Sequence, residues 1–295
     1  MEKSTLKGYL MAFSGYLLCG VLPIYWHNLN SISSFEVLMF RIFFSALTLV
    51  IFVYATKNSL FISYLKDKKL RIRLMITSAL IALNWGLFIY AVGSSLVLQA
   101  SLGYYINPLV SILLGVVFLK EKLDKAKIIA VFLAFIGVLY MTISLGEFPY
   151  ISIVLAVSFG LYGYMKKQLS LDSYNSLLVE TLILSVLAWA YFIYLMLSGT
   201  SGFSKMSSLE WVLVALSGII TCIPLILFNE GAKAIPLSSL GFLQYLTPTL
   251  MLLISVLLYG ESFTIVHAIS FALIWAGYLI YILSVIFHPK QKNAK

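Results

Sequence analysis

Ser101-Leu102-Gly103-Tyr104-Tyr105-Ile106-Asn107-Pro108 and Ser239-Leu240-Gly241-Phe242-Leu243-Gln244-Tyr245-Leu246-Thr247-Pro248 are two versions of one pattern. Each begins with Ser-Leu-Gly and an aromatic residue, and each ends at a proline inside a long apolar stretch. From the proline onward the spacings are the same in both copies, to Glu121 and Gly137 in the first and to Glu261 and Gly277 in the second. The chain therefore contains an internal repeat, and the offset between its copies is nearly half of the chain.

The chain is far more apolar than a water-soluble domain. Of its 295 residues, 61% are hydrophobic and 11% are charged, and the mean hydropathy is +1.00, whereas a soluble domain is about 25% charged. The stretches 74–119, 128–146, 211–229, 234–260 and 262–289 contain no Asp, Glu, Lys or Arg. Since a spanning helix requires about 20 mostly apolar residues, we expect one integral membrane domain.

Loop signals divide the chain into ten expected helices. Gly93-Ser94-Ser95, 146–149 and 198–202 are rich in residues that interrupt helices. The expected helices run approximately over 8–27, 35–55, 73–93, 96–119, 126–144, 148–166, 175–197, 209–228, 236–259 and 263–287. The alternative is nine spans, with the third and fourth helices joined, but the uncharged stretch 74–119 is too long for one span.

The basic residues indicate an orientation. If both termini are cytoplasmic, 18 of the 20 Lys and Arg residues lie on the inner side, while Lys205 lies outside and Arg41 lies within a span. This asymmetry follows the positive-inside rule. It also explains the net charge of +9 by contact with anionic headgroups. We therefore expect membrane lipids as partners, and no nucleic acid.

The number of helices in each repeat sets the relation between the repeats. Residues 1–145 and 146–295 would each hold five helices, so the second repeat would enter the membrane from the opposite side. The predicted fold is an all-α polytopic membrane protein with ten transmembrane helices in two inverted five-helix repeats and both termini cytoplasmic. Inverted repeats of this kind are typical of secondary transporters.

Three stretches of the chain resemble a known family. Residues 84–92, 101–109 and 241–249 are similar to RarD-type proteins of the EamA group in the drug/metabolite transporter superfamily. The resemblance extends over essentially the whole chain. It implies ten helices in two inverted repeats, the inner or plasma membrane of a bacterium, and export of small molecules such as chloramphenicol. It also places the fifth and tenth helices at the periphery, where a homodimer would form.

The two repeated prolines predict a substrate site. Pro108 and Pro248 each lie near the middle of an expected span, and so near the bilayer midplane. A proline inside a helix leaves the carbonyl four residues earlier without its partner, here the carbonyls of Tyr104 and Gln244. In lipid such carbonyls need another partner or a water-filled cavity. The alternative is that both prolines only bend their helices for packing.

Polar and aromatic neighbours complete the predicted site. The third helix contributes Asn84 and Trp85, an amide and an aromatic wall that suit an amphipathic solute. For Asn84 the alternative is a hydrogen bond between helices. The predicted substrate-binding residues are Asn84, Trp85, Tyr104, Asn107, Pro108, Gln244, Tyr245, Thr247 and Pro248.

Arg41 and Glu180 are the charges that lie furthest inside the expected spans. Such charges are costly in a membrane and usually have a function. Arg41 is near the outer end of its helix and Glu180 near the inner end of its own, so they are expected at opposite depths and not as an ion pair. We predict gating or coupling roles for both, with snorkelling or a bond to a neighbouring helix as the alternatives. For Glu121 and Glu261, which recur in the repeat, a structural role at a helix end is the preferred interpretation.

Sequence motifs for other functions are missing. The chain has no paired carboxylates, no metal-ligand spacing and no glycine-rich phosphate loop. We expect no cofactor, no metal and no enzymatic activity, and a small molecule as the transported partner. Transport would proceed by alternating access, driven by a gradient or by exchange. A passive channel and a membrane-embedded lipid-modifying enzyme remain as alternatives.

Overall fold

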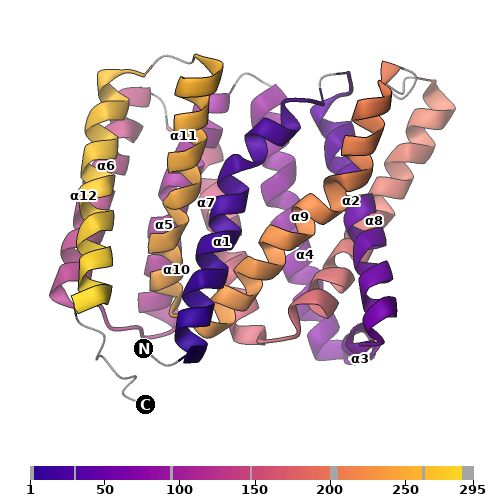
Figure 1. The fold of residues 1–295 in the computed structure, drawn as a ribbon, viewed down its shortest axis with the longest axis horizontal. Helices are drawn as coiled ribbons and strands as arrows, with labels where there is room; N and C mark the ends of the chain where they lie inside the picture. The colour runs from indigo at the N-terminus through magenta and orange to yellow at the C-terminus, as the bar shows by residue number, and fades with distance from the viewer. Residues whose placement is uncertain are drawn as a thin grey trace.

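The chain folds into a slab of helices that run mostly side by side (Figure 1). The computed structural model describes residues 3–29, 31–93, 96–146, 148–199, 205–260 and 263–287, and no strand occurs within these ranges. The helices are α1 (Lys3–Trp26), α2 (Ser34–Thr56), α3 (Leu60–Lys66), α4 (Lys68–Gly93), α5 (Val97–Phe118), α6 (Lys125–Leu145), α7 (Tyr150–Leu169), α8 (Ser173–Ser198), α9 (Ser208–Ala234), α10 (Leu237–Gln244), α11 (Leu246–Tyr259) and α12 (Ile265–Phe287).

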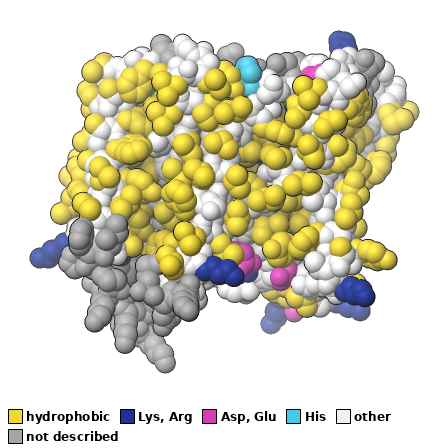
Figure 2. All heavy atoms as spheres, in the orientation of Figure 1, with side chains coloured by type: hydrophobic (Ala, Val, Ile, Leu, Met, Phe, Trp, Pro, Cys, Tyr) yellow, Lys and Arg dark blue, Asp and Glu magenta, His cyan; other side chains and the backbone are white. Residues whose placement is uncertain are grey.

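The outer surface of the slab is apolar. Large hydrophobic side chains cover the face in Figure 2, and the side chains of Leu197 and Leu257 are 84% and 80% exposed. In the described part of the chain, nine helical spans are long and apolar enough to cross a membrane, with α10 and α11 counted as one span and α7 not among the nine. Apolar surface of this extent is stable in lipid and not in water. The protein is therefore an all-α, multi-pass membrane protein.

Charged side chains lie mostly where the helices begin and end. In Figure 2 the Lys and Arg side chains lie mostly along the lower edge. Helix α1 begins and helix α12 ends at this same edge (Figure 1). The helix beginnings at the opposite edge are fixed by side chains. Ser33 and Glu36 form a capping box at α2, and Ser207 and Glu210 form another at α9.

The helix boundaries depart from the expected ranges in several places, and α1 and α4 each begin five residues early, at Lys3 and Lys68. The short helix α3 was not expected, and it is held to α8 by a hydrogen bond from the Phe61 N–H to Asn175 Oδ1 at 2.9 Å. Helix α9 continues to Ala234, beyond the expected end at 228. The expected span 236–259 is divided at Tyr245 into α10 and α11, whereas α5 continues through Pro108. The two repeated prolines therefore have different effects on their helices.

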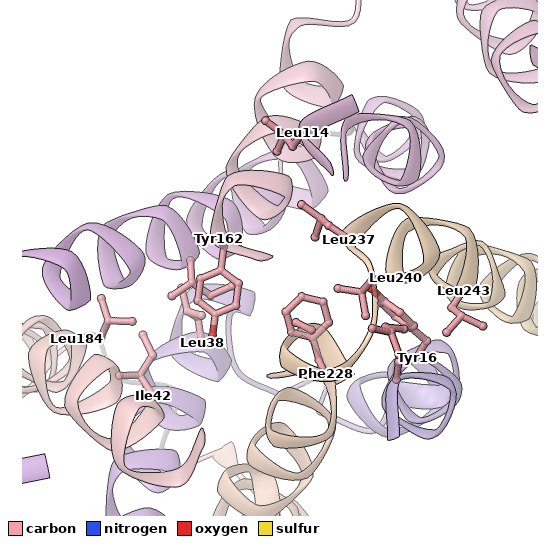
Figure 3. Close-up of a cluster of buried hydrophobic side chains, with 14 of the residues drawn as sticks. Tyr16, Leu38, Ile42, Leu114, Tyr162, Leu184, Phe228, Leu237, Leu240 and Leu243 are labelled. Carbon is pink, nitrogen blue, oxygen red and sulfur yellow. The ribbon is translucent and has the colours of Figure 1, made fainter. Parts of the chain in front are cut away.

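The core lies where α1, α7, α9 and α10 meet. Tyr16, Tyr162, Phe228 and Leu237 are buried there, and the rings of Tyr162 and Phe228 stack (Figure 3). Small residues permit the closest approach of helices. An added Cβ on Gly231 would lie 2.7 Å from the Ala12 Cβ, a distance that side chains do not tolerate, so glycine is what allows α1 and α9 to cross in contact.

Candidate functional site

Arg41 lies inside the membrane-spanning part of α2, about 10 Å from the first residue of the helix at 1.5 Å per residue. Its Nε donates a hydrogen bond to Thr221 Oγ1 at 3.2 Å. The guanidinium carbon lies 4.5 Å from the ring centre of Trp26 and 5.0 Å from that of Trp85. At these distances each indole attracts the cation. Arg41 is thus held between two aromatic rings contributed by α1 and α4.

The predicted substrate residues Trp85 and Tyr104 join this cluster. Tyr104 is close enough to Arg41 to interact with its charge, and its ring meets the edge of Phe88 at 5.7 Å. Arg41, Trp26, Trp85, Tyr104 and Phe88 are all partly exposed. The gating residue and two of the substrate residues predicted from the sequence therefore belong to one group, which we call the Arg41 cluster (Arg41, Trp26, Trp85 and Tyr104).

Asn84 faces α7. Its amide nitrogen donates to the Leu155 carbonyl at 2.8 Å and to Ser158 Oγ at 3.1 Å. These bonds join α4 to α7 and correspond to the interhelical alternative considered for this residue. The amide nitrogen of Asn84 is therefore already occupied by protein groups in this conformation.

The other predicted substrate residues form a separate, closed group. Asn107, Pro108, Gln244, Tyr245, Thr247 and Pro248 are all buried. Thr247 Oγ1 donates to the carbonyl of Tyr16 at 2.9 Å, and Ser111 Oγ donates to Asn107 Oδ1 at 3.4 Å. The sequence placed these six residues in one locality, and the structure packs them between α5, α10, α11 and α1.

The two prolines lie at the contact between their helices. An added Cβ on Gly241 would be 2.7 Å from the Pro108 carbonyl oxygen. The Tyr105 hydroxyl donates to the Pro248 carbonyl at 3.1 Å. The Tyr245 hydroxyl is buried and has no hydrogen-bond partner among the described residues. Because a buried hydroxyl without a partner is costly, Tyr245 is the member of this group best placed to bind a polar group of a solute.

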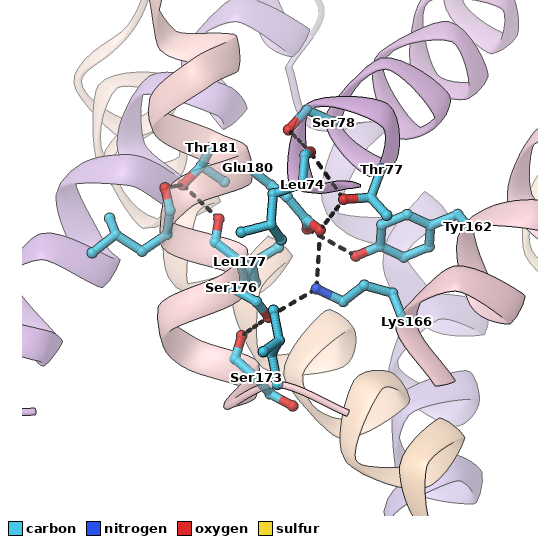
Figure 4. Close-up of polar contacts among 12 residues, drawn as sticks. Leu74, Thr77, Ser78, Tyr162, Lys166, Ser173, Ser176, Leu177, Glu180 and Thr181 are labelled. Carbon is cyan, nitrogen blue, oxygen red and sulfur yellow. Dashed lines mark hydrogen bonds and ion pairs between the residues drawn. The ribbon is translucent and has the colours of Figure 1, made fainter. Parts of the chain in front are cut away.

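Glu180 is the centre of a buried polar network between α4, α7 and α8 (Figure 4). Its carboxylate forms an ion pair with Lys166 Nζ at 3.0 Å and accepts hydrogen bonds from Thr77 Oγ1 at 2.6 Å and the Tyr162 hydroxyl at 3.2 Å. Lys166 also donates to Ser176 Oγ at 2.9 Å. The network joins α4, α7 and α8, and Glu180 is 0% exposed.

From the sequence, Lys166 was one of the basic residues counted on the inner side, at the last position of the expected helix 148–166, and its burial was not predicted. Lys166 lies within α7 and is 5% exposed. A signal was present in the spacing, because Tyr162 and Lys166 are four residues apart on α7, as are Ser176 and Glu180 on α8. Two such pairs on consecutive helices place four polar groups on facing sides.

A narrow recess adjoins this network at the ends of α7, α8 and α9. Lys166, Ser176, Asn229 and Lys233 line it. Asn229 is buried beside the Tyr162 hydroxyl, but its amide nitrogen and oxygen have no partner within hydrogen-bonding distance among the described residues.

Arg41 and Glu180 do not pair with each other. Each binds a threonine on another helix, Thr221 for Arg41 and Thr77 for Glu180. Glu121 has a structural role, because its two carboxylate oxygens accept the backbone N–H groups of Leu237 at 2.6 Å and Ser238 at 2.8 Å at the start of α10. Glu261, its counterpart in the repeat, lies outside the described residues.

Among the described residues, no group of three His, Cys, Asp or Glu side chains could hold a metal ion. Cys19 and Cys222 are free thiols.

Comparison with known proteins gives a consistent result. The model of the EamA-like transporter family matches twice, at residues 6–143 and 149–283. The uncharacterized transporter YojE of Bacillus subtilis is 38% identical over 95% of both chains. Protein RarD of Escherichia coli is 36% identical over 99% of both chains. Chloramphenicol-sensitive protein RarD of Pseudomonas aeruginosa is 28% identical over 93% of both.

A solved crystal structure has the same fold. It superposes with a TM-score of 0.69 and covers 94% of this chain and 97% of its own, at 19% sequence identity. At this identity the likeness concerns the fold alone.

Proposed function

The chain belongs to the EamA-like transporter family, and from this premise we propose that it is a secondary transporter that exports small amphipathic molecules by alternating access. We place it in the plasma membrane of a bacterium. The observation that carries the proposal is Arg41, a cation inside a span that meets aromatic rings and a threonine. A charge at such a depth is costly and usually serves a solute pathway.

Reciprocal contacts between α6 and α12 support two inverted repeats. An added Cβ on Gly137 would lie 2.8 Å from the Ser270 carbonyl oxygen, and one on Gly277 would lie 2.6 Å from the Ala130 carbonyl oxygen. Gly277 is the repeat counterpart of Gly137, and Ser270 is that of Ala130, at the same offset that relates the two prolines. A pseudo-two-fold axis exchanges contacts in this way.

A second exchange occurs around the repeated prolines. An added Cβ on Gly20 would lie 2.7 Å from Leu250 Cδ1, and one on Gly160 would lie 2.8 Å from Val110 Cγ1. Gly160 and Leu250 follow Gly20 and Val110, respectively, by this same offset. These contacts favour ten spans, with α7 as the counterpart of α1 and the α10–α11 pair as the counterpart of α5.

We propose that the charged edge of the slab faces the cytoplasm, as the positive-inside rule requires. On this assignment the Lys166–Glu180 pair lies toward the inner side and Arg41 toward the outer side. The ion pair would then hold α7, α8 and α4 together when the inner side is closed, and its release would open that side. Glu180, with Lys166, Tyr162 and Thr77 around its carboxylate, is also the proposed site of proton coupling.

The peripheral position of α6 and α12 supports a homodimer through these helices. They lie side by side at the left end of the slab in Figure 1, and their residues Phe132, Phe135 and Leu283 are exposed. Membrane lipids cover the same surface in a monomer. Light scattering in two detergents and in nanodiscs distinguishes the two states by mass.

Counterflow in proteoliposomes tests the proposed function. Vesicles are loaded with chloramphenicol or with other small amphipathic metabolites, and uptake of the labelled compound is followed with and without a proton gradient. Chloramphenicol is the first probe because of the name of the Pseudomonas aeruginosa relative. A carrier gives saturable uptake that rises with solute on the far side. A channel gives uptake without this stimulation, and an enzyme gives an altered product.

Matched variants locate the site in the same assay. We expect Gln244→Ala and Asn107→Ala to abolish counterflow, because both amides lie in the buried group between the two prolines. Gln168→Ala is the control for the same chemical change at an exposed position of α7. Absence of counterflow for every compound in the wild-type protein would contradict the transporter proposal.

A further inference from the structure

We infer that the Arg41 cluster binds the carboxylate group of an aromatic organic anion. The inference rests on the proposed transport function, but it concerns binding and can be measured without transport. It adds Trp26 to the residues considered from the sequence, and it names a chemical class of solute that the family comparison does not give.

The first step concerns the free hydrogen-bond donors of Arg41. A guanidinium carries five N–H groups in a planar fork that matches a carboxylate. In the described part of the chain its one hydrogen bond is the bond from Nε to Thr221 Oγ1. Trp26 and Trp85 attract the guanidinium carbon at 4.5 and 5.0 Å through their ring faces, and among the described residues no oxygen accepts a hydrogen bond from the terminal nitrogens. The terminal N–H groups therefore remain for a ligand.

The second step concerns the missing counter-charge. Carboxylates elsewhere in the described structure already have partners: Glu180 binds Lys166, Glu230 binds Lys233, Asp124 binds Lys127, and Glu121 binds the start of α10. No described carboxylate forms an ion pair with Arg41. A cation inside a span and without a protein counter-ion gains most from an anion that the solute itself brings.

The third step concerns the body of the solute. The rings of Trp26 and Trp85 face the cation, the rings of Tyr104 and Phe88 pack against each other, and all four residues are partly exposed, so the cluster offers aromatic surface beside the charge. Indole and phenol rings pack against flat apolar groups. Since no described carboxylate lies at the cluster to receive an ammonium group, the site favours a simple anion over a zwitterion or a cation. An aromatic monocarboxylate has the required features.

Tryptophan fluorescence of the purified full-length protein provides the test. Two of the five tryptophans, Trp26 and Trp85, lie in the cluster, so a bound ligand changes their emission. The probes are 3-phenylpropionate, its neutral analogue 3-phenylpropanamide, and the zwitterion phenylalanine. We expect saturable quenching by 3-phenylpropionate, and binding of the other two at least about thirtyfold weaker, as for loss of one partner of a buried charge pair.

Variants then assign the signal. Arg41→Gln should weaken binding of 3-phenylpropionate by at least about thirtyfold, and Arg41→Lys should weaken it less, because it keeps the charge and loses the fork. Arg73→Gln is the matched control, since Arg73 is exposed on α4. Trp85→Phe should reduce the quenching amplitude, whereas Trp189→Phe, at an exposed position of α8, should not.

The outcomes separate the inference from the proposed function. Equal binding of the acid and its amide by the wild-type protein, or no saturable binding of the acid, overturns the inference even if a variant fails to fold. Binding of the acid that survives Arg41→Gln also overturns it and indicates that Arg41 only holds helices together. Counterflow of neutral solutes without anion binding would leave the transporter proposal standing. Anion binding without counterflow would support the inference and contradict the transporter proposal.

Discussion

At the level of single residues, the Lys166–Glu180 pair loses a large hydration free energy on burial and gains a strong electrostatic attraction in return. Both side chains are buried, at 5% and 0% exposure, so each charge has lost its hydration. The pair offsets that loss because Thr77, Tyr162 and Ser176 satisfy the remaining donors and acceptors. Removal of one charge leaves the other buried without a partner, which is more costly than removal of both.

We therefore expect Glu180→Ala to lower the free energy of unfolding by about 3 kcal/mol. The double variant Lys166→Met, Glu180→Leu should recover most of this stability, because apolar side chains of similar size replace the pair. The control is Glu230→Ala, which breaks the partly exposed Lys233–Glu230 pair at 2.6 Å and should cost less than about 1 kcal/mol. Unfolding is followed by circular dichroism during titration with SDS. Equal losses for Glu180→Ala and Glu230→Ala would refute this account of the pair.

The candidate site shows which residues could be predicted from the sequence. Arg41 and Glu180 were recognised because a charge inside an apolar stretch is visible in the sequence alone. Lys166 was not, because a lysine at the end of an apolar stretch has the same appearance whether it is solvated or buried against the next helix. Trp26 was also missed, since its contact with Arg41 brings the end of α1 to a residue of α2, which no spacing within one helix reveals.

At the level of helices, close approach through glycine determines which faces meet. Gly218 in α9 lies against the backbone of α2, where an added Cβ would be 2.2 Å from the Phe44 carbonyl oxygen. Gly86 in α4 also lies inside a helix, but an added Cβ there would meet nothing within 4 Å. Both glycines therefore lie in helical backbone, but only Gly218 is packed closely against another helix.

Alanine at these two positions should have opposite effects. We expect Gly218→Ala to destabilise the protein by about 1–3 kcal/mol, because α2 and α9 must move apart. Gly86→Ala should be neutral or stabilising by up to about 1 kcal/mol, the helix preference of alanine over glycine. Thermal unfolding in detergent measures both. A loss at Gly86 as large as that at Gly218 would show that close packing is not the cause.

The two repeated prolines, Pro108 and Pro248, also differ in the helices that surround them. The repeat predicted equivalent helices, but α5 continues through Pro108, while a one-residue turn at Tyr245 divides the other span into α10 and α11 three residues before Pro248. A proline removes the same N–H in both helices, so the difference arises from the surroundings, which a repeated motif does not specify. The short helix α3 escaped prediction for a related reason, because so short a segment gives too little periodicity to recognise.

This difference predicts unequal effects of replacement. Pro248→Ala restores an N–H that can bond to the Gln244 carbonyl and join α10 to α11, so we expect a stiffer span, unchanged or higher thermal stability, and slower counterflow. Pro108→Ala should slow counterflow less, because α5 is already continuous. Rates from proteoliposomes, with protein orientation in the vesicles matched, provide the comparison. If Pro108→Ala slows transport as much as Pro248→Ala, the break at Tyr245 is not a hinge.

At the level of the whole molecule, the predicted resemblance to RarD-type EamA proteins is confirmed by the relatives and by the family match. The all-helical membrane fold follows from composition, because lipid leaves helices as the way for apolar segments of about 20 residues to satisfy their backbone. Orientation depends on the small number of charges and on the side of the membrane that retains them. It therefore stays a prediction that chemistry in intact cells must decide.

Cysteine labelling decides that orientation. With Cys19 and Cys222 replaced by alanine, single cysteines are introduced at Lys68, exposed at the start of α4, and at Lys205, exposed before α9. If the termini are cytoplasmic, a membrane-impermeant maleimide added to intact cells labels Lys205→Cys and leaves Lys68→Cys unmodified, while both react after lysis. The positive-inside rule requires this result, because lysine-rich loops remain on the cytoplasmic side during insertion. The reverse pattern would invert the molecule and would move Arg41 to the inner side and the Lys166–Glu180 pair to the outer side. Labelling of both sites in intact cells would indicate insertion in two orientations, which would remove the basis for assigning inner and outer gates.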